Sequence, residues 1–158
     1  MSTIATVDEH AQIVEAFVTE ADEIFVRLEE LLLQLEETPD DEELLHAIFR
    51  EAHTIKGNAA CLQYDGLTSF AHVFEELLER LRNGEEHATT KCVSLLLDAL
   101  DALRDLATRS IAGEGALTAA QEALMQQLLQ VSAPGVTGSQ PVAAYATNND
   151  GLRARRSS

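Results

Sequence analysis

The sequence predicts an all-α protein, an antiparallel up-and-down four-helix bundle with an additional C-terminal helix. Its 158 residues are 46% hydrophobic but only 4% aromatic and include no Trp, a composition that suits Leu- and Ala-rich helices better than β-strands. Five successive segments repeat apolar residues at three- and four-residue steps, the period of a helix face. The connections between these segments are short, and short connections favour antiparallel neighbours.

The first predicted helix covers Ile13 to Leu35, whose apolar residues fall on one face. An acidic run after Pro39 ends this helix and starts the next one. We expect Asp40 to cap free backbone N–H groups there and Glu43 to complete a capping box. The second helix then turns one apolar face inward, formed by Leu44, Leu45, Ile48, Phe49, Ala52 and Ile55.

Three further helices follow along the chain. Residues 57–66 hold two glycines and several small residues, which predicts a connection between the second helix and the third. The third helix stops at Gly84, and a Leu-rich fourth helix ends near Gly113, because glycine adopts the left-handed backbone that closes a helix. Thr118 and Gln121 resemble a capping box, which opens the shorter fifth helix.

The chain divides into a predicted domain, residues 1–131, and a flexible linker or tail, residues 132–158. After Val131 the sequence is rich in Ser, Ala, Pro, Gly, Thr and Asn. Such a composition buries too little apolar surface to offset the entropy lost on ordering. The basic residues at the very end are either native or a remnant of expression, and we assign them no function.

Composition and charge exclude several kinds of function. The chain has 27 acidic and 11 basic residues, and this net charge of −16 would repel a nucleic-acid backbone. No apolar run approaches the roughly 20 residues that a membrane span requires, and an N-terminus with Asp8 and Glu9 is not a signal peptide. Cys61 and Cys92 form no C-x-x-C pair. We therefore expect a cytoplasmic protein that neither binds nucleic acid nor inserts into a membrane.

His53 is the candidate functional residue. Helical geometry places it off the apolar centre of the second helix, so its imidazole should be partly exposed. Lys56 lies three residues on, and Gly57, one turn on, leaves room for a bulky partner. Glu75 and His72 share a face of the third helix that can meet the second. Because a neutral imidazole oriented by a carboxylate is a good nucleophile, we expect Glu75 to orient His53, with Lys56 and His72 completing a polar cluster.

Two motifs make this region specific. The segment from Ile48 to Gly57 reads Ile-Phe-Arg-Glu-Ala-His-Thr-Ile-Lys-Gly, and the segment from Phe70 to Leu78 contains His-x-x-Glu. Together they closely resemble the N-terminal histidine phosphotransfer (HPt) domain of chemotaxis histidine kinases of the CheA type. The resemblance spans roughly residues 13–131, and its A-H-[ST]-I-K-G core is far more specific than the helical pattern around it.

The resemblance implies a phosphoryl carrier in a two-component system. By it, His53 is the phosphorylated nucleophile, which accepts the γ-phosphoryl group of ATP from a kinase ATP-binding domain, in cis or in trans. It then passes the group to an aspartate on a CheY-like receiver domain of a response regulator. Glu75 matches the carboxylate that hydrogen-bonds the imidazole, Lys56 and His72 match the surrounding charge network, and Gly57 matches the glycine beside the site.

The chain itself has no sequence motif for nucleotide binding. It contains no G-x-x-x-x-G-K-[ST] and is too short for an ATP-binding fold beside the bundle. We therefore expect no cofactor and no metal in this chain: ATP and Mg²⁺ act through the kinase domain, and Mg²⁺ through the receiver. An apolar fringe of Ile55, Leu62 and Leu67 either receives a receiver helix or belongs to the core.

Three other interpretations compete with a kinase-derived carrier. A free-standing phosphorelay protein would take its phosphoryl group from one receiver and give it to another. A scaffolding bundle would have no chemistry, and His53 would be an ordinary surface residue. A di-iron site needs two Glu-x-x-His motifs, whereas only the segment from Glu43 to His46 fits.

Overall fold

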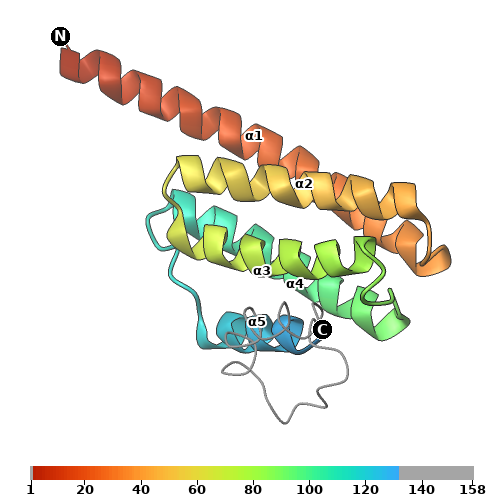
Figure 1. The fold of residues 1–158 in the computed structure, drawn as a ribbon. Helices are drawn as coiled ribbons and strands as arrows, with labels where there is room; N and C mark the ends of the chain where they lie inside the picture. The colour runs from red at the N-terminus through yellow and green to blue at the C-terminus, as the bar shows by residue number, and fades with distance from the viewer. Residues whose placement is uncertain (1, 132–158) are drawn as a thin grey trace, which may run out of the picture.

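The computed structural model describes residues 2–131, which form five α-helices and no strand. They are α1 (Ser2–Glu37), α2 (Glu42–Cys61), α3 (Asp65–Arg82), α4 (Thr90–Ile111) and α5 (Ala119–Val131). The first four helices run alternately up and down, with α2 and α4 each packed against both α1 and α3 (Figure 1). The predicted all-α bundle is confirmed, and the predicted tail lies outside the described residues.

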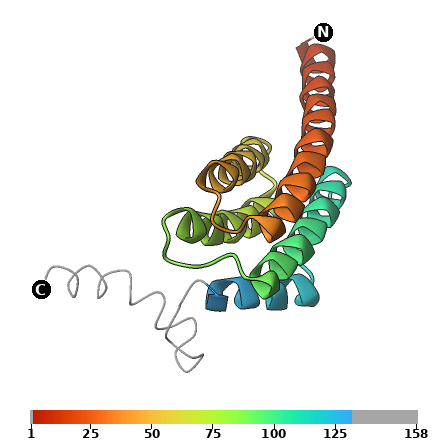
Figure 2. The same ribbon diagram turned by 90° about the vertical axis from the view of Figure 1, so that its right-hand side faces the viewer.

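The added helix α5 follows α4 in the sequence and packs on one side of the four-helix bundle. It contacts α3 and α4, and Figure 2 shows it below the bundle, on the far side of α3 and α4 from α2. The same view shows the N-terminal part of α1 extending beyond the other helices. None of the helices in residues 2–131 is long and apolar enough to cross a membrane.

Two predictions about α2 were wrong. Its N-cap is Asp41 rather than Asp40, because the Asp41 side chain accepts the Leu44 N–H at 3.1 Å. The helix also continues through Gly57 instead of ending there. Its apolar period extends to Ala59, which is buried, and this burial outweighs the roughly 1 kcal/mol that a glycine costs inside a helix. Only residues 62–64 connect α2 to α3.

The first helix begins earlier than predicted, at Ser2 rather than Ile13, whereas the ends of α3 and α4 and the start of α5 follow the sequence signals. Gly84 and Gly113 have φ of +79° and +83°, so the predicted stops of α3 and α4 are confirmed. The capping box of α5 is confirmed as well. The Thr118 N–H donates to Gln121 Oε1 at 3.0 Å, and the Gln121 N–H donates to Thr118 Oγ1 at 3.1 Å.

A polar clamp fastens α5 to the bundle. Arg109 of α4 donates to Asp105 Oδ2 at 2.8 Å, to Gln121 Oε1 at 2.8 Å and to the carbonyls of Glu114 and Ala116. Gln121 closes the ring by donating to Asp105 Oδ2 at 2.7 Å. The hydrogen bond from Arg109 lowers the pKa of Asp105, so the clamp contains a paired carboxylate.

The core is made by the inward faces of all five helices. Its largest fully buried side chains are Phe70, Phe74, Ile24, Leu28, Leu32, Leu35, Ile48, Ile55, Leu67, Leu77, Leu78 and Leu96. α3 supplies five of these, because it packs against α2, α4 and α5. The middle of α3, which carries the buried Glu75, is therefore held from three sides.

Two helical glycines should respond in opposite ways to the same substitution. A Cβ at Gly66 would collide with the carbonyl oxygen of Gly115, whereas a Cβ at Gly57 would meet nothing within 4 Å. We expect Gly66→Ala to lower the free energy of unfolding by about 1–3 kcal/mol. Gly57→Ala should raise it by up to about 1 kcal/mol, because alanine is the better helix former. Urea denaturation measures both, and equal stability of the two variants would contradict the close approach of Gly66 to Gly115.

Candidate functional site

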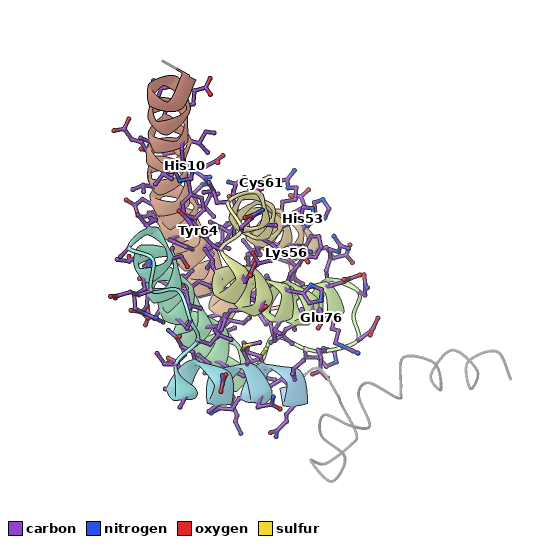
Figure 3. All side chains as sticks on the ribbon, turned by 90° about the vertical axis from the view of Figure 1, so that its left-hand side faces the viewer. His10, His53, Lys56, Cys61, Tyr64 and Glu76 are labelled. Carbon is purple, nitrogen blue, oxygen red and sulfur yellow. The ribbon has the colours of Figure 1, made fainter. Side chains whose placement is uncertain are left out.

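The candidate site lies on the outer side of the α2–α3 pair. The apolar face of α2 turns Ile48, Ala52 and Ile55 into the core, and this leaves His53 pointing outward with 64% of its side chain exposed. Figure 3 shows His53 and Lys56 on the side of α2 that lies away from α1. The predicted exposure of the imidazole is confirmed.

Glu75 joins the two helices at this site. It projects from the middle of α3, and only 7% of its side chain is exposed. Its two oxygens bind different partners: Oε2 pairs with His53 Nδ1, and Oε1 accepts from Lys56 Nζ at 2.5 Å. A buried carboxylate needs such partners, because leaving it unpaired would cost several kcal/mol.

The two hydrogen bonds keep Glu75 ionised. Burial is the largest single influence and acts to raise its pKa. Together, the hydrogen bonds and charges of Lys56 and His53 have a larger effect than burial, so the pKa of Glu75 lies below its ordinary value. An ionised carboxylate only accepts hydrogen bonds. His53 must therefore donate from Nδ1 to this carboxylate, and whenever the ring is neutral its lone pair lies on Nε2.

The remaining predicted residues lie in different surroundings. His72 is exposed on α3 and pairs with Glu76 at 3.3 Å, away from the group of His53, Lys56 and Glu75. Gly57 lies one turn beyond His53 on the exposed face of α2, and the space above it is open. The structure thus brings together three of the predicted polar residues and leaves room beside them.

The apolar fringe is mostly core. Ile55 and Leu67 are 1% and 0% exposed, so they cannot touch a receiver, and the suggestion that they form a docking surface was wrong. Both lie on the face along which α2 and α3 pack into the bundle. Leu62 is half-buried at the end of α2 and also packs on the core.

Two residues beside the imidazole were not predicted from the sequence. The Phe49 ring lies nearly parallel to the His53 ring, with centroids 6.1 Å apart and planes inclined by 17°. Arg82, the last residue of α3, places its Cζ 4.1 Å from the Phe49 ring centroid. The four-residue step from Phe49 to His53 could have indicated the first contact. The second depends on the pairing of α2 with α3, which no sequence pattern specified.

A resident metal finds no support in the part of the chain that the structure describes. Within residues 2–131 no group of three or more His, Cys, Asp and Glu side chains is arranged to hold a metal ion.

The chemistry available at the site is that of the exposed His53 imidazole, whose other ring nitrogen is bound to the Glu75 carboxylate. Such a pair suits nucleophilic attack by Nε2.

The sequence is similar to those of known chemotaxis proteins. The sequence is 31% identical over 140 residues to the chemotaxis protein CheA of Bacillus subtilis, covering 88% of this chain and 21% of that protein. It is 38% identical over 99 residues to the sensor histidine kinase CheAY of Helicobacter pylori, covering 63% of this chain and 12% of that protein. The chain thus spans about a fifth or less of the length of these relatives.

Solved structures show the same bundle. The phosphorylated P1 domain of CheA3 from R. sphaeroides, in complex with CheY6, matches with a TM-score of 0.70 and 28% identity, covering 77% of this chain and 96% of that one. The CheA phosphotransferase domain of Thermotoga maritima matches with a TM-score of 0.61 and 28% identity, covering 65% and 97%. The family model of the Hpt domain matches residues 12–106, and the chain therefore belongs to the Hpt domain family.

Proposed function

We propose that this chain is the phosphoryl carrier of a chemotaxis-type two-component system. His53 accepts a phosphoryl group from the ATP-binding domain of a histidine kinase and donates it to the receiver aspartate of a CheY-like response regulator. One observation carries the proposal: His53 Nδ1 is bound to the ionised Glu75 while the imidazole remains exposed. The likeness to a phosphorylated CheA3 domain in complex with CheY6 supports it.

In the accepting step, the lone pair of His53 Nε2 attacks the γ-phosphorus of ATP. The Nε2–P bond forms as the bond from phosphorus to the ADP oxygen breaks, and ADP leaves with that electron pair. The imidazole gains positive charge during the attack. Glu75 is already in place at Nδ1 to stabilise that charge, so no reorganisation is required.

In the donating step, a carboxylate oxygen of the receiver aspartate attacks the same phosphorus. The Nε2–P bond breaks, and its electron pair returns to Nε2. The neutral imidazole that results still carries its proton on Nδ1, hydrogen-bonded to Glu75. His53 is thereby restored for another cycle, with no net change in this chain.

Lys56 acts on the carboxylate of Glu75 rather than on the phosphoryl group. Its Nζ lies 2.5 Å from Glu75 Oε1, and a quarter of its side chain is exposed. By occupying one oxygen, Lys56 leaves the other for His53 and offsets part of the carboxylate charge. This pairing fixes which oxygen receives the imidazole N–H.

The other components of the reaction belong to the partners. ATP and Mg²⁺ enter with the kinase domain, and Mg²⁺ also with the receiver, because this sequence has no nucleotide-binding motif. The kinase domain acts in cis or in trans, and the exchange takes place in the cytoplasm. The CheA relatives, which are several times longer than this chain, support a parent protein with further domains.

The first test is phosphorylation of His53. On incubation with ATP and a chemotaxis-type kinase ATP-binding domain supplied in trans, intact-mass analysis should show one acid-labile phosphoryl group. The His53→Gln variant should show none. His72→Gln serves as the matched control and should still be phosphorylated, because His72 pairs with Glu76. A chain that neither such kinase domains nor phosphorylated receivers modify would be a binding bundle, and the proposal would fail.

The second test removes the charge of Glu75. Glu75→Gln should slow phosphorylation of His53 about tenfold or more, because the neutral amide no longer fixes the Nδ1 proton or stabilises the ring cation. The initial rate of incorporation from radiolabelled ATP measures the effect. A rate within twofold of the parent would contradict the role given to this carboxylate.

The lowered pKa of Glu75 also predicts a pH dependence of stability. A carboxylate with a depressed pKa stabilises the fold above its unfolded value of about 4.3, and this contribution is lost as the pH falls through the folded value. The parent should therefore be more stable than Glu75→Gln at pH 7, and the difference should shrink below about pH 4.3. Urea denaturation between pH 3 and 7 measures it, and a constant difference would argue against an ionised Glu75.

A further inference from the structure

One hydrogen bond does not by itself define the orientation of an exposed imidazole. The contact between Nδ1 and Glu75 fixes one point of the His53 ring. The ring can still turn about that contact, because the outer side-chain torsion of histidine has a broad energy profile. With 64% of the side chain exposed, the core offers little further restraint. A second contact is needed to hold the ring plane.

Phe49 supplies that contact. It precedes His53 by four residues on α2, which places the two side chains one above the other on the helix. Their centroids lie 6.1 Å apart and their planes are inclined by only 17°, within the 4.5–7 Å range that aromatic pairs favour. Phe49 is itself half-buried and packs on the core, so it is a firmer support than an exposed side chain.

Arg82 holds Phe49 from the other helix. Its Cζ lies 4.1 Å from the ring centroid, well inside the distance at which a guanidinium is attracted to an aromatic face. Its place at the C-terminus of α3 favours a cation. Four other arginines of the described residues bind carboxylates instead: Arg27, Arg80, Arg104 and Arg109.

We propose that Phe49 and Arg82 are positioning residues for His53, an inference that rests on the proposed function. Phe49 holds the imidazole plane so that Nδ1 stays on Glu75 and Nε2 stays open to the incoming phosphorus. Arg82 holds the Phe49 ring. α3 thus orients the reacting nitrogen in two ways. Glu75 acts directly on the imidazole, and Arg82 acts indirectly by holding Phe49 of α2 beside it.

Orientation of this kind affects the rate because phosphoryl transfer requires the attacking atom, phosphorus and leaving oxygen to lie nearly in line. A displacement of about 1 Å can cost on the order of a hundredfold in rate. A ring that turns freely would spend only part of its time with Nε2 in the attacking direction. Loss of the Phe49 contact should therefore reduce phosphorylation without removing the nucleophile.

The test uses Phe49→Leu and Arg82→Gln in the whole chain. We expect phosphorylation of His53 by phosphoramidate, a small donor that needs no docking, to fall about fivefold in Phe49→Leu and about twofold to threefold in Arg82→Gln. Phe49→Tyr, which keeps the ring, should restore a rate within twofold of the parent. The double variant should be no slower than Phe49→Leu alone, because the two residues act as one unit.

Arg80→Gln is the matched control. Arg80 lies on the same last turn of α3 but pairs with Glu85 at 3.0 Å, so its removal should leave the rate unchanged. Circular dichroism and thermal unfolding establish that each variant is folded. Arg82→Gln changes no core residue, and it therefore keeps the test valid if Phe49→Leu destabilises the bundle.

A readout without phosphate separates this inference from the proposed function. In the parent, the ¹⁵N–¹H spectrum of the His53 imidazole should show one tautomer with its proton on Nδ1. In Phe49→Leu and Arg82→Gln, the signals should broaden or show both tautomers. Unchanged spectra in folded variants would overturn the positioning role. Altered spectra in a chain that no donor phosphorylates would uphold the role and reject the carrier function.

Discussion

The ion pairs of Glu75 depend on how α2 packs against α3, and the site depends on those ion pairs. α3 contacts α2, α4 and α5, so the middle of this helix is held from three sides and a carboxylate placed there is buried. Burial alone would favour the protonated acid, but Lys56 and His53 outweigh it and lower the pKa of Glu75. Folding thereby creates a fixed negative charge, and that charge determines which imidazole nitrogen bears the proton.

The surroundings of His53 combine rigidity with access. Glu75 is buried, whereas the imidazole is exposed and a Cβ at Gly57 would meet no neighbour within 4 Å. The first feature holds the imidazole in one orientation, and the second leaves room beside it for a bulky partner. Gly57 lowers helix propensity at that position, so the chain gives up some stability where the surface beside His53 is open.

The rest of the bundle serves to keep α3 in place. The clamp of Arg109, Asp105 and Gln121 fastens α5 to α4, and α5 in turn covers α3. Gly66 allows the start of α3 to approach the backbone at Gly115. These contacts lie away from His53, yet they fix the helix that carries Glu75 and Arg82, the two residues through which α3 acts on the imidazole.

The sequence by itself determined the helices and the identity of the central polar residues. Apolar periodicity and the glycines at 84 and 113 specify local backbone states, and the motif around His53 is contiguous along one helix. Periodicity could not decide the end of α2, because the burial of Ala59 overrides Gly57. Nor could it show that Ile55 and Leu67 are core or that Arg82 meets Phe49. Those facts depend on the rotation and register of one helix against another, which side-chain packing across the bundle decides and no single helix encodes.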